Sequence, residues 1–103
     1  TLTRDYKQTV IRRVVNDEVF AKSMLDEALT LFLGGEPEVA RLMLRELVNA
    51  TVGFEELAVL TQKPSKSLHR MLSAKGNPSM DNLSMIFGAL RDRLRVSIEV
   101  RVS

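Results

Sequence analysis

The sequence predicts an all-α fold with one β-strand after the last helix. Apolar residues recur every three or four positions through most of the 103-residue chain, which is the spacing of amphipathic helices. Glycine and proline divide these stretches, most clearly at Gly34-Gly35 and at Pro78. After residue 94 the period changes to two, which is strand spacing. The alternating apolar residues are Val96, Ile98, Val100 and Val102.

The length is that of one domain, and a chain of this size buries a core without metal or disulfide. We therefore expect one domain over residues 1–103. Within it we expect an N-terminal helical extension (1–35), a helical core (36–94) and a C-terminal strand (95–103).

The extension is expected to hold two helices. Residues 4–15 have an apolar face, and a packing arm is their favoured role. A second helix over 18–33 follows Asp17, a good N-cap, and Gly34-Gly35 ends it by taking the left-handed conformation.

Two longer helices are expected in the core. Pro37 opens one of them, with Arg41 and Arg45 on its polar side, and we interpret those arginines as a solvated face in preference to a partner or phosphate contact. Ser79 is a good N-cap for the other, which runs to Leu94 and closes the core.

Between them lie two short helices, at about 54–61 and 65–73, joined by Gln62-Lys63-Pro64. Proline suits a first helical turn and pushes the preceding residue out of the α region, so the second helix begins afresh near Ser65. Two short helices joined by a tight turn make a helix-turn-helix.

This segment is basic. The net charge of +2 is too small to indicate nucleic-acid binding, but no Asp or Glu occurs from Leu57 to Met80. A local positive field of this kind suits a polyanion. The positive groups are Lys63, Lys66, Arg70 and Lys75, with His69 as a further candidate.

Side-chain chemistry gives each polar residue of this segment a candidate role. Arg70, one turn after Lys66, is the first choice for reading guanine, which a guanidinium binds bidentately. Lys66 acts as a point charge, and Ser65 and Ser67 bond a phosphate or a base edge. The expected contacts to the DNA backbone are Lys63, Lys75 and Asn77. For His69 two roles stay open, a phosphate contact or an ordinary exposed side chain.

The order of these residues resembles the Cro/C1-type (lambda repressor-like, XRE-like) helix-turn-helix family. Within it, the sequence is most similar to HigA-like antidote proteins of addiction modules, and the resemblance covers about half the chain. The residues that carry it are Leu57-Ala58, Leu68, Met71, Gly76-Asn77-Pro78-Ser79, Leu83, Ile86 and Ala89-Leu90. It implies a transcriptional regulator, a repressor that binds operator DNA and often autoregulates a toxin operon.

Three positions differ from the family pattern. Gln62 stands where the family usually has glycine, so we expect a modified turn. Pro64 replaces a capping Ser or Thr, so Ser65 or a shifted start must cap the helix. Phe54 replaces a phosphate-binding Gln, and we expect it to be a core anchor.

We expect no enzymatic activity and no cofactor. Cysteine is absent, there is a single histidine, and no glycine-rich phosphate loop occurs. No apolar run approaches the roughly 20 residues that span a bilayer, and no signal peptide is apparent, so we expect a cytoplasmic protein without membrane contact.

The expected partners are double-stranded DNA and a second copy of the chain. An unpaired strand is a template for pairing, so we expect strand 95–102 to pair antiparallel with its copy in a two-fold dimer. A toxin protein and the chain's own amino terminus are competing partners for the strand. The alternative function is a helical protein interaction module that keeps the fold without binding DNA.

Overall fold

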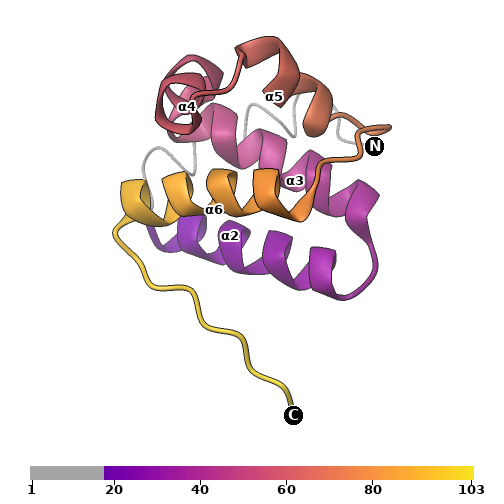
Figure 1. The fold of residues 1–103 in the computed structure, drawn as a ribbon. Coiled ribbons are helices and arrows are strands. Elements are labelled where there is room, and N and C mark those ends of the chain that lie inside the picture. Colours follow the sequence, from indigo (N-terminus) through magenta and orange to yellow (C-terminus); the bar gives the residue numbers. More distant parts are fainter. Residues whose placement is uncertain (1–17) are drawn as a thin grey trace, which may run out of the picture.

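The computed structural model describes residues 18–103, and these residues are all-α, as expected (Figure 1). The helix expected over 4–15, with Asp17, lies outside the described residues. The helices are α2 (Glu18–Leu33), α3 (Pro37–Ala50), α4 (Gly53–Thr61), α5 (Ser65–Met71) and α6 (Met80–Leu94).

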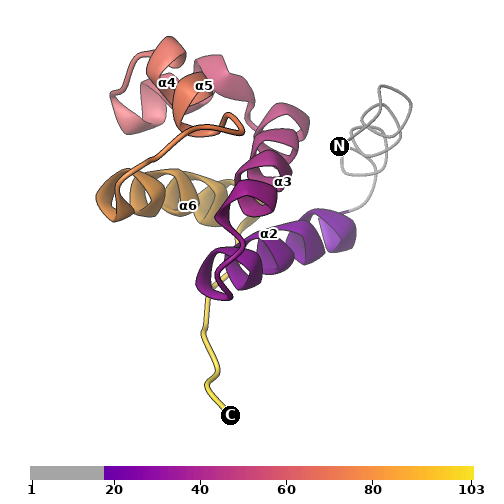
Figure 2. The same cartoon turned by 90° about the vertical axis from the view of Figure 1, so that its right-hand side faces the viewer.

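The helices stack from one end of the molecule to the other. Helix α2 lies along α6 at one end, α4 and α5 form the other end, and α3 runs between them (Figures 1 and 2). Helix α2 makes its most extensive contact with α3, while α4 packs on α3, α5 and α6. The two short helices are therefore held on a platform of longer ones.

One hydrophobic core joins all these helices, because each contributes buried apolar side chains to it. Helix α2 supplies Ala21, Leu25 and Ala28, so it belongs to the core and is more than an appended arm. The rings of Phe32 and Phe87 meet edge to face with centroids 5.8 Å apart, which adds to the α2–α6 contact. The largest fully buried side chains are Leu44, Leu47, Val48, Leu57, Leu68, Leu72, Ile86 and Leu90.

Three helices end in the same left-handed motif. Helix α2 ends at Gly35 (φ 87°), with Glu36 donating to the carbonyl of Leu31. This confirms the expected glycine stop. Gln62 (φ 57°) ends α4 and Arg95 (φ 55°) ends α6 in the same way, without glycine.

The turn after α4 therefore corrects one expectation. We expected a modified turn because Gln62 replaces glycine, but Gln62 itself takes the left-handed conformation (φ 57°, ψ 36°). The amide of Lys63 donates to the carbonyl of Ala58, and this bond closes the helix end. The closed end outweighs the cost of placing a Cβ in the left-handed region, which is about 1 kcal/mol.

The helix starts follow the expected residues. Pro37 begins α3, and the hydroxyl of Ser79 accepts from the amide of Asn82 at the start of α6. At α5 the expected cap is missing: the helix begins at Ser65 after an extended Pro64, and no side chain caps it. The α5 start is thus fixed by the rigid φ of proline. Helix α5 ends at Met71, two residues before the expected end.

The C-terminal strand expected over 95–103 is absent from the described chain. Residues 96–103 carry no strand hydrogen bonding and form a tail, whose far end extends away from the helices (Figure 1). Val96 and Ile98 pack against the core, whereas Val100 and Val102 are 66% and 92% exposed. The physical reason is that a strand needs a partner edge, and none of residues 18–103 supplies one.

Candidate nucleic-acid interface

Helix α5 is anchored by one face. Leu68 and, just after the helix, Leu72 are fully buried, and Met71 is half-buried against the same core. The opposite face is open to solvent, with Lys66, His69 and Arg70 all exposed. This arrangement gives a short rigid helix whose polar face is free to meet a ligand.

Phe54, in the first turn of α4, supports α5 directly. Phe54 is buried, as expected of a core anchor. Its ring stacks on the imidazole of His69, with centroids 3.8 Å apart and planes 19° apart. His69 is exposed, as one of its two expected roles requires, but one face of its ring packs against Phe54 between α4 and α5. Its phosphate contact stays a prediction.

Arg41 of α3 fixes the other end of α5. Its Nε donates to the carbonyl of Ser73 at 3.0 Å, and its Nη2 donates to the carbonyl of Ala74 at 2.7 Å. These carbonyls follow the last turn of α5, where a positive charge is favourable. The interpretation of Arg41 as a solvated residue is therefore wrong. Only the fold brings position 41 to position 74, so spacing along the sequence carried no signal for this contact.

The turn after α5 needs glycine at position 76 for space. A Cβ there would lie 2.5 Å from the carbonyl oxygen of Arg70 and closer still to that of Met71. The amide of Gly76 donates to Ser73, whose hydroxyl donates back to the carbonyl of Arg70. The chain thus folds tightly against the end of α5 before it enters α6.

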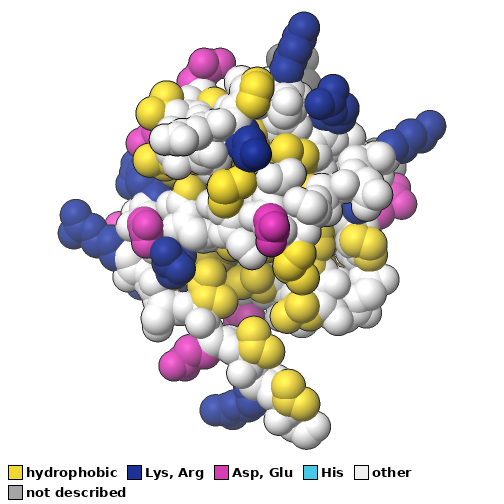
Figure 3. Space-filling model, in the orientation of Figure 1, with side chains coloured by type: hydrophobic (Ala, Val, Ile, Leu, Met, Phe, Trp, Pro, Cys, Tyr) yellow, Lys and Arg dark blue, Asp and Glu magenta, His cyan; other side chains and the backbone are white. Residues whose placement is uncertain are grey.

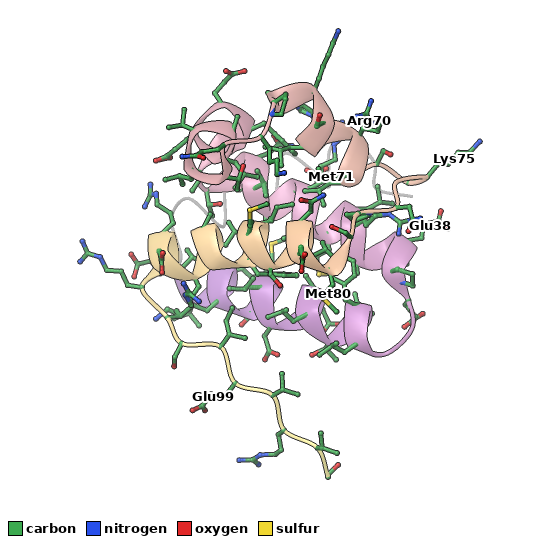
Figure 4. The ribbon with its side chains drawn as sticks, viewed as in Figure 1. Glu38, Arg70, Met71, Lys75, Met80 and Glu99 are labelled. Carbon is green, nitrogen blue, oxygen red and sulfur yellow. The ribbon has the colours of Figure 1, made fainter. Side chains whose placement is uncertain are left out.

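All the expected site residues lie on this end of the molecule. Basic side chains gather there over α5 and the turn that follows it (Figure 3). Arg70 lies on α5, and Lys75 points outward from the turn (Figure 4). The exposed residues are Lys66, His69, Arg70, Lys75 and Asn77, and the half-buried ones are Lys63, Ser65 and Ser67.

The acid-free stretch of the sequence lies at one end of the molecule (Figure 1). It includes the second half of α4, all of α5 and the turn up to Met80. The flanking carboxylates, on Glu55, Glu56 and Asp81, are exposed in the first turns of α4 and α6. An anion that approaches α5 therefore meets Lys66 and Arg70 on a helix that carries no carboxylate of its own.

The described residues offer neither a metal site nor a membrane-spanning helix. Within 18–103, no group of three or more His, Asp or Glu side chains is placed to hold a metal ion. None of the described helices is long and apolar enough to cross a membrane.

No protein-family model matches the chain, and neither a curated protein nor a solved structure does so. The resemblance to Cro/C1-type proteins therefore stays a prediction from the residues quoted above. What the chain does has to be argued from the geometry of α4, α5 and the turn.

Proposed function

We propose that this protein is a sequence-specific DNA-binding transcriptional regulator, a repressor of the Cro/C1 helix-turn-helix type. One observation carries the proposal. Helix α5 is anchored through Leu68 and Leu72, and its opposite face presents Lys66 and Arg70 in a stretch without carboxylates. An anchored helix with free cations on its outer face is the arrangement that enters a major groove.

Sequence reading falls to the exposed face of α5. Arg70 donates two hydrogen bonds to the O6 and N7 acceptors of guanine, a pairing worth about 1–3 kcal/mol of discrimination against the wrong base. Lys66, one turn earlier, offers a point charge to a second base or a phosphate. The hydroxyls of Ser65 and Ser67 bond a phosphate or a base edge.

The flanking residues hold the DNA backbone. Lys63 precedes α5, and Lys75 and Asn77 follow it, so the three bracket the reading helix. Contacts of this kind set the register and the salt dependence of binding, but they carry no sequence information. His69 keeps its ring edge for a phosphate while its face stays on Phe54.

A rigid mounting of α5 favours specificity, because base contacts depend on sub-ångström placement of donors. Phe54 holds the middle of the helix through His69, and Arg41 holds its C-terminal end. The Arg41 guanidinium is engaged with two carbonyls, so it is assigned to positioning α5 and not to DNA.

The proposal extends to assembly. A two-fold dimer would place two α5 helices roughly 34 Å apart on a pseudo-palindromic operator. As in the antidote proteins that the sequence resembles, autoregulation and a toxin partner belong to the proposal. It includes no catalytic step, cofactor or membrane contact.

The test is binding to fragments of the protein's own promoter region at two salt concentrations with excess competitor DNA. The Lys66→Ala/Arg70→Ala variant is compared with Lys22→Ala/Arg93→Ala, which removes the same charge from exposed positions on α2 and α6. We expect competitor-resistant binding that falls with salt, is lost in the first variant and survives in the second.

Two results would contradict the proposal. Equal losses in the two variants would show nonspecific attraction between DNA and a basic protein. A folded protein that binds no promoter fragment specifically would favour the helical interaction module, whose partner binding is retained when Lys66 and Arg70 are replaced.

A further inference from the structure

The tail after α6 is held at its start and open beyond it. Val96 and Ile98 pack against the core, and with Leu25 and Leu29 they line a shallow hollow of about 320 Å³ beside α2. Val100 and Val102 continue the same alternation into solvent, at 66% and 92% exposure. Apolar side chains along this tail are visible at the surface (Figure 3). The alternating apolar side chains of this segment are thus packed against the helices at Val96 and Ile98 and exposed to solvent at Val100 and Val102.

We propose that residues 97–103 pair antiparallel with the same residues of a second copy, in the register that places Val100 opposite itself on the two-fold axis. The inference rests on the dimer in the proposed function and is independent of DNA binding. In this register Ile98 faces Val102 of the other copy, and Glu99 faces Arg101. Side chains on directly opposite residues share one face of the ribbon, so the apolar row stays apolar and the polar row pairs opposite charges.

Charge distinguishes this register from its neighbours. Centring the pair on Glu99 places the two Glu99 carboxylates opposite each other, and centring it on Arg101 does the same with two guanidinium groups. Centring on Ile98 would oppose Arg101 to Arg95, which is left-handed at φ 55° and cannot join a strand, so Arg101 and Val102 would stay unpaired. A shift by a single residue in one strand moves the apolar row to the polar face. A pair centred on Ser97 would need Arg95 in a strand, but Arg95 is left-handed at φ 55°.

The surroundings are consistent with a second copy. Glu99 and Arg101 are exposed, and neither forms an ion pair with another described residue. An isolated two-stranded ribbon is marginal in water, but packing against a helix stabilises it. Ile98 already lies against α2, so Val102 of the second copy, directly opposite, extends that apolar contact.

A charge-reversal series tests the register by analytical ultracentrifugation across the micromolar range without DNA. Glu99→Arg or Arg101→Glu alone converts two opposite-charge pairs into two like pairs, and we expect each to weaken dimerisation by about tenfold or more. The double variant Glu99→Arg/Arg101→Glu restores the complement and should return to near the wild-type value. Arg93→Glu, an equal charge change on α6, is the control and should leave dimerisation unchanged.

A cross-link gives an independent test, because the chain has no cysteine of its own. Under mild oxidation, Val100→Cys should form a covalent dimer, since position 100 meets its own copy. Glu99→Cys, which meets Arg101, should form little.

The inference is overturned if the wild-type chain stays monomeric. That is the result expected if residues 1–17 or a toxin, and not a second copy, cover the tail. It is also overturned if both single reversals dimerise like the wild type, or if the two cysteine variants cross-link equally. If Glu99→Arg loses dimerisation while the wild type still binds DNA, the result bears only on the register of the strands. If specific DNA binding fails while the reversal series behaves as expected, only the regulator proposal is contradicted.

Discussion

The Nη2 of Arg41 lies 2.7 Å from the carbonyl oxygen of Ala74, so a side chain of α3 is hydrogen-bonded to the turn that follows α5. A second bond, from Nε to the carbonyl of Ser73, is 3.0 Å long. Together they use the Nε/Nη2 edge of the guanidinium to fix the carbonyls of two consecutive residues. Arg41 therefore contributes both to the stability of the fold and to the position of the turn after α5.

Replacing Arg41 with Ala should destabilise the fold by about 1–2 kcal/mol, because hydrogen bonds from a charged donor are lost at a half-buried site. Urea unfolding measures the change, and promoter binding by the folded variant should weaken as well. Arg45→Ala, on the same helix, is the control, with an expected effect within about 0.5 kcal/mol. Equal effects at the two positions would remove the special role of Arg41.

Gly76→Ala should destabilise by about 1–3 kcal/mol, because the new methyl would overlap the carbonyl oxygens of Arg70 and Met71. Gly88→Ala is a matched control, for which we expect a change in stability of the opposite sign. Gly88 lies within α6, where an added Cβ meets nothing nearer than the Arg91 guanidinium at 3.8 Å. That variant should gain up to about 1 kcal/mol of helix propensity. Thermal unfolding of both variants decides the matter, and a neutral Gly76→Ala would contradict the close packing of the turn.

Gln62→Gly should raise the free energy of unfolding by about 0.5–1 kcal/mol, because glycine takes the left-handed conformation without a Cβ penalty. Arg95→Gly tests the same rule at the end of α6, where φ is 55°. Gly35→Ala should lose stability for the same reason. A loss of stability in both glycine variants would show that side-chain contacts of Gln62 and Arg95 outweigh backbone strain.

Phe54→Leu separates packing from ring stacking. Leucine keeps an apolar side chain in the core, so the loss of stability should stay below about 1.5 kcal/mol, against about 3–5 kcal/mol for Phe54→Ala. Either change removes the aromatic face that lies 3.8 Å from the His69 ring. NMR of the His69 ring protons should show the loss of ring-current shift in both variants. Unchanged histidine shifts in Phe54→Leu would contradict the stack.

The features of the candidate site that depend on residue type and on spacing along the chain could be predicted from the sequence. The basic, acid-free segment, the buried Phe54 and the helix break at Pro64 follow from residue type and spacing. Arg41 was misassigned because its partners lie 33 and 32 positions away. His69 was left with two roles because stacking depends on how α4 crosses α5.

Within residues 18–103, the sequence by itself determined where the five helices form and where α2 stops. Periodicity, proline at helix starts and Gly35 act over a few neighbouring residues, so they can be followed along the chain. Only the tertiary structure decided that Gln62 accepts a left-handed turn, that Arg41 closes the end of α5, and that residues 96–103 form no strand in one chain. The Arg41 contact and the missing strand depend on groups distant in sequence, namely two carbonyls from another part of the chain and a partner edge that residues 18–103 do not provide. The turn at Gln62 is closed by local hydrogen bonds to Ala58 and is fixed in place by the packing of α4 on the core.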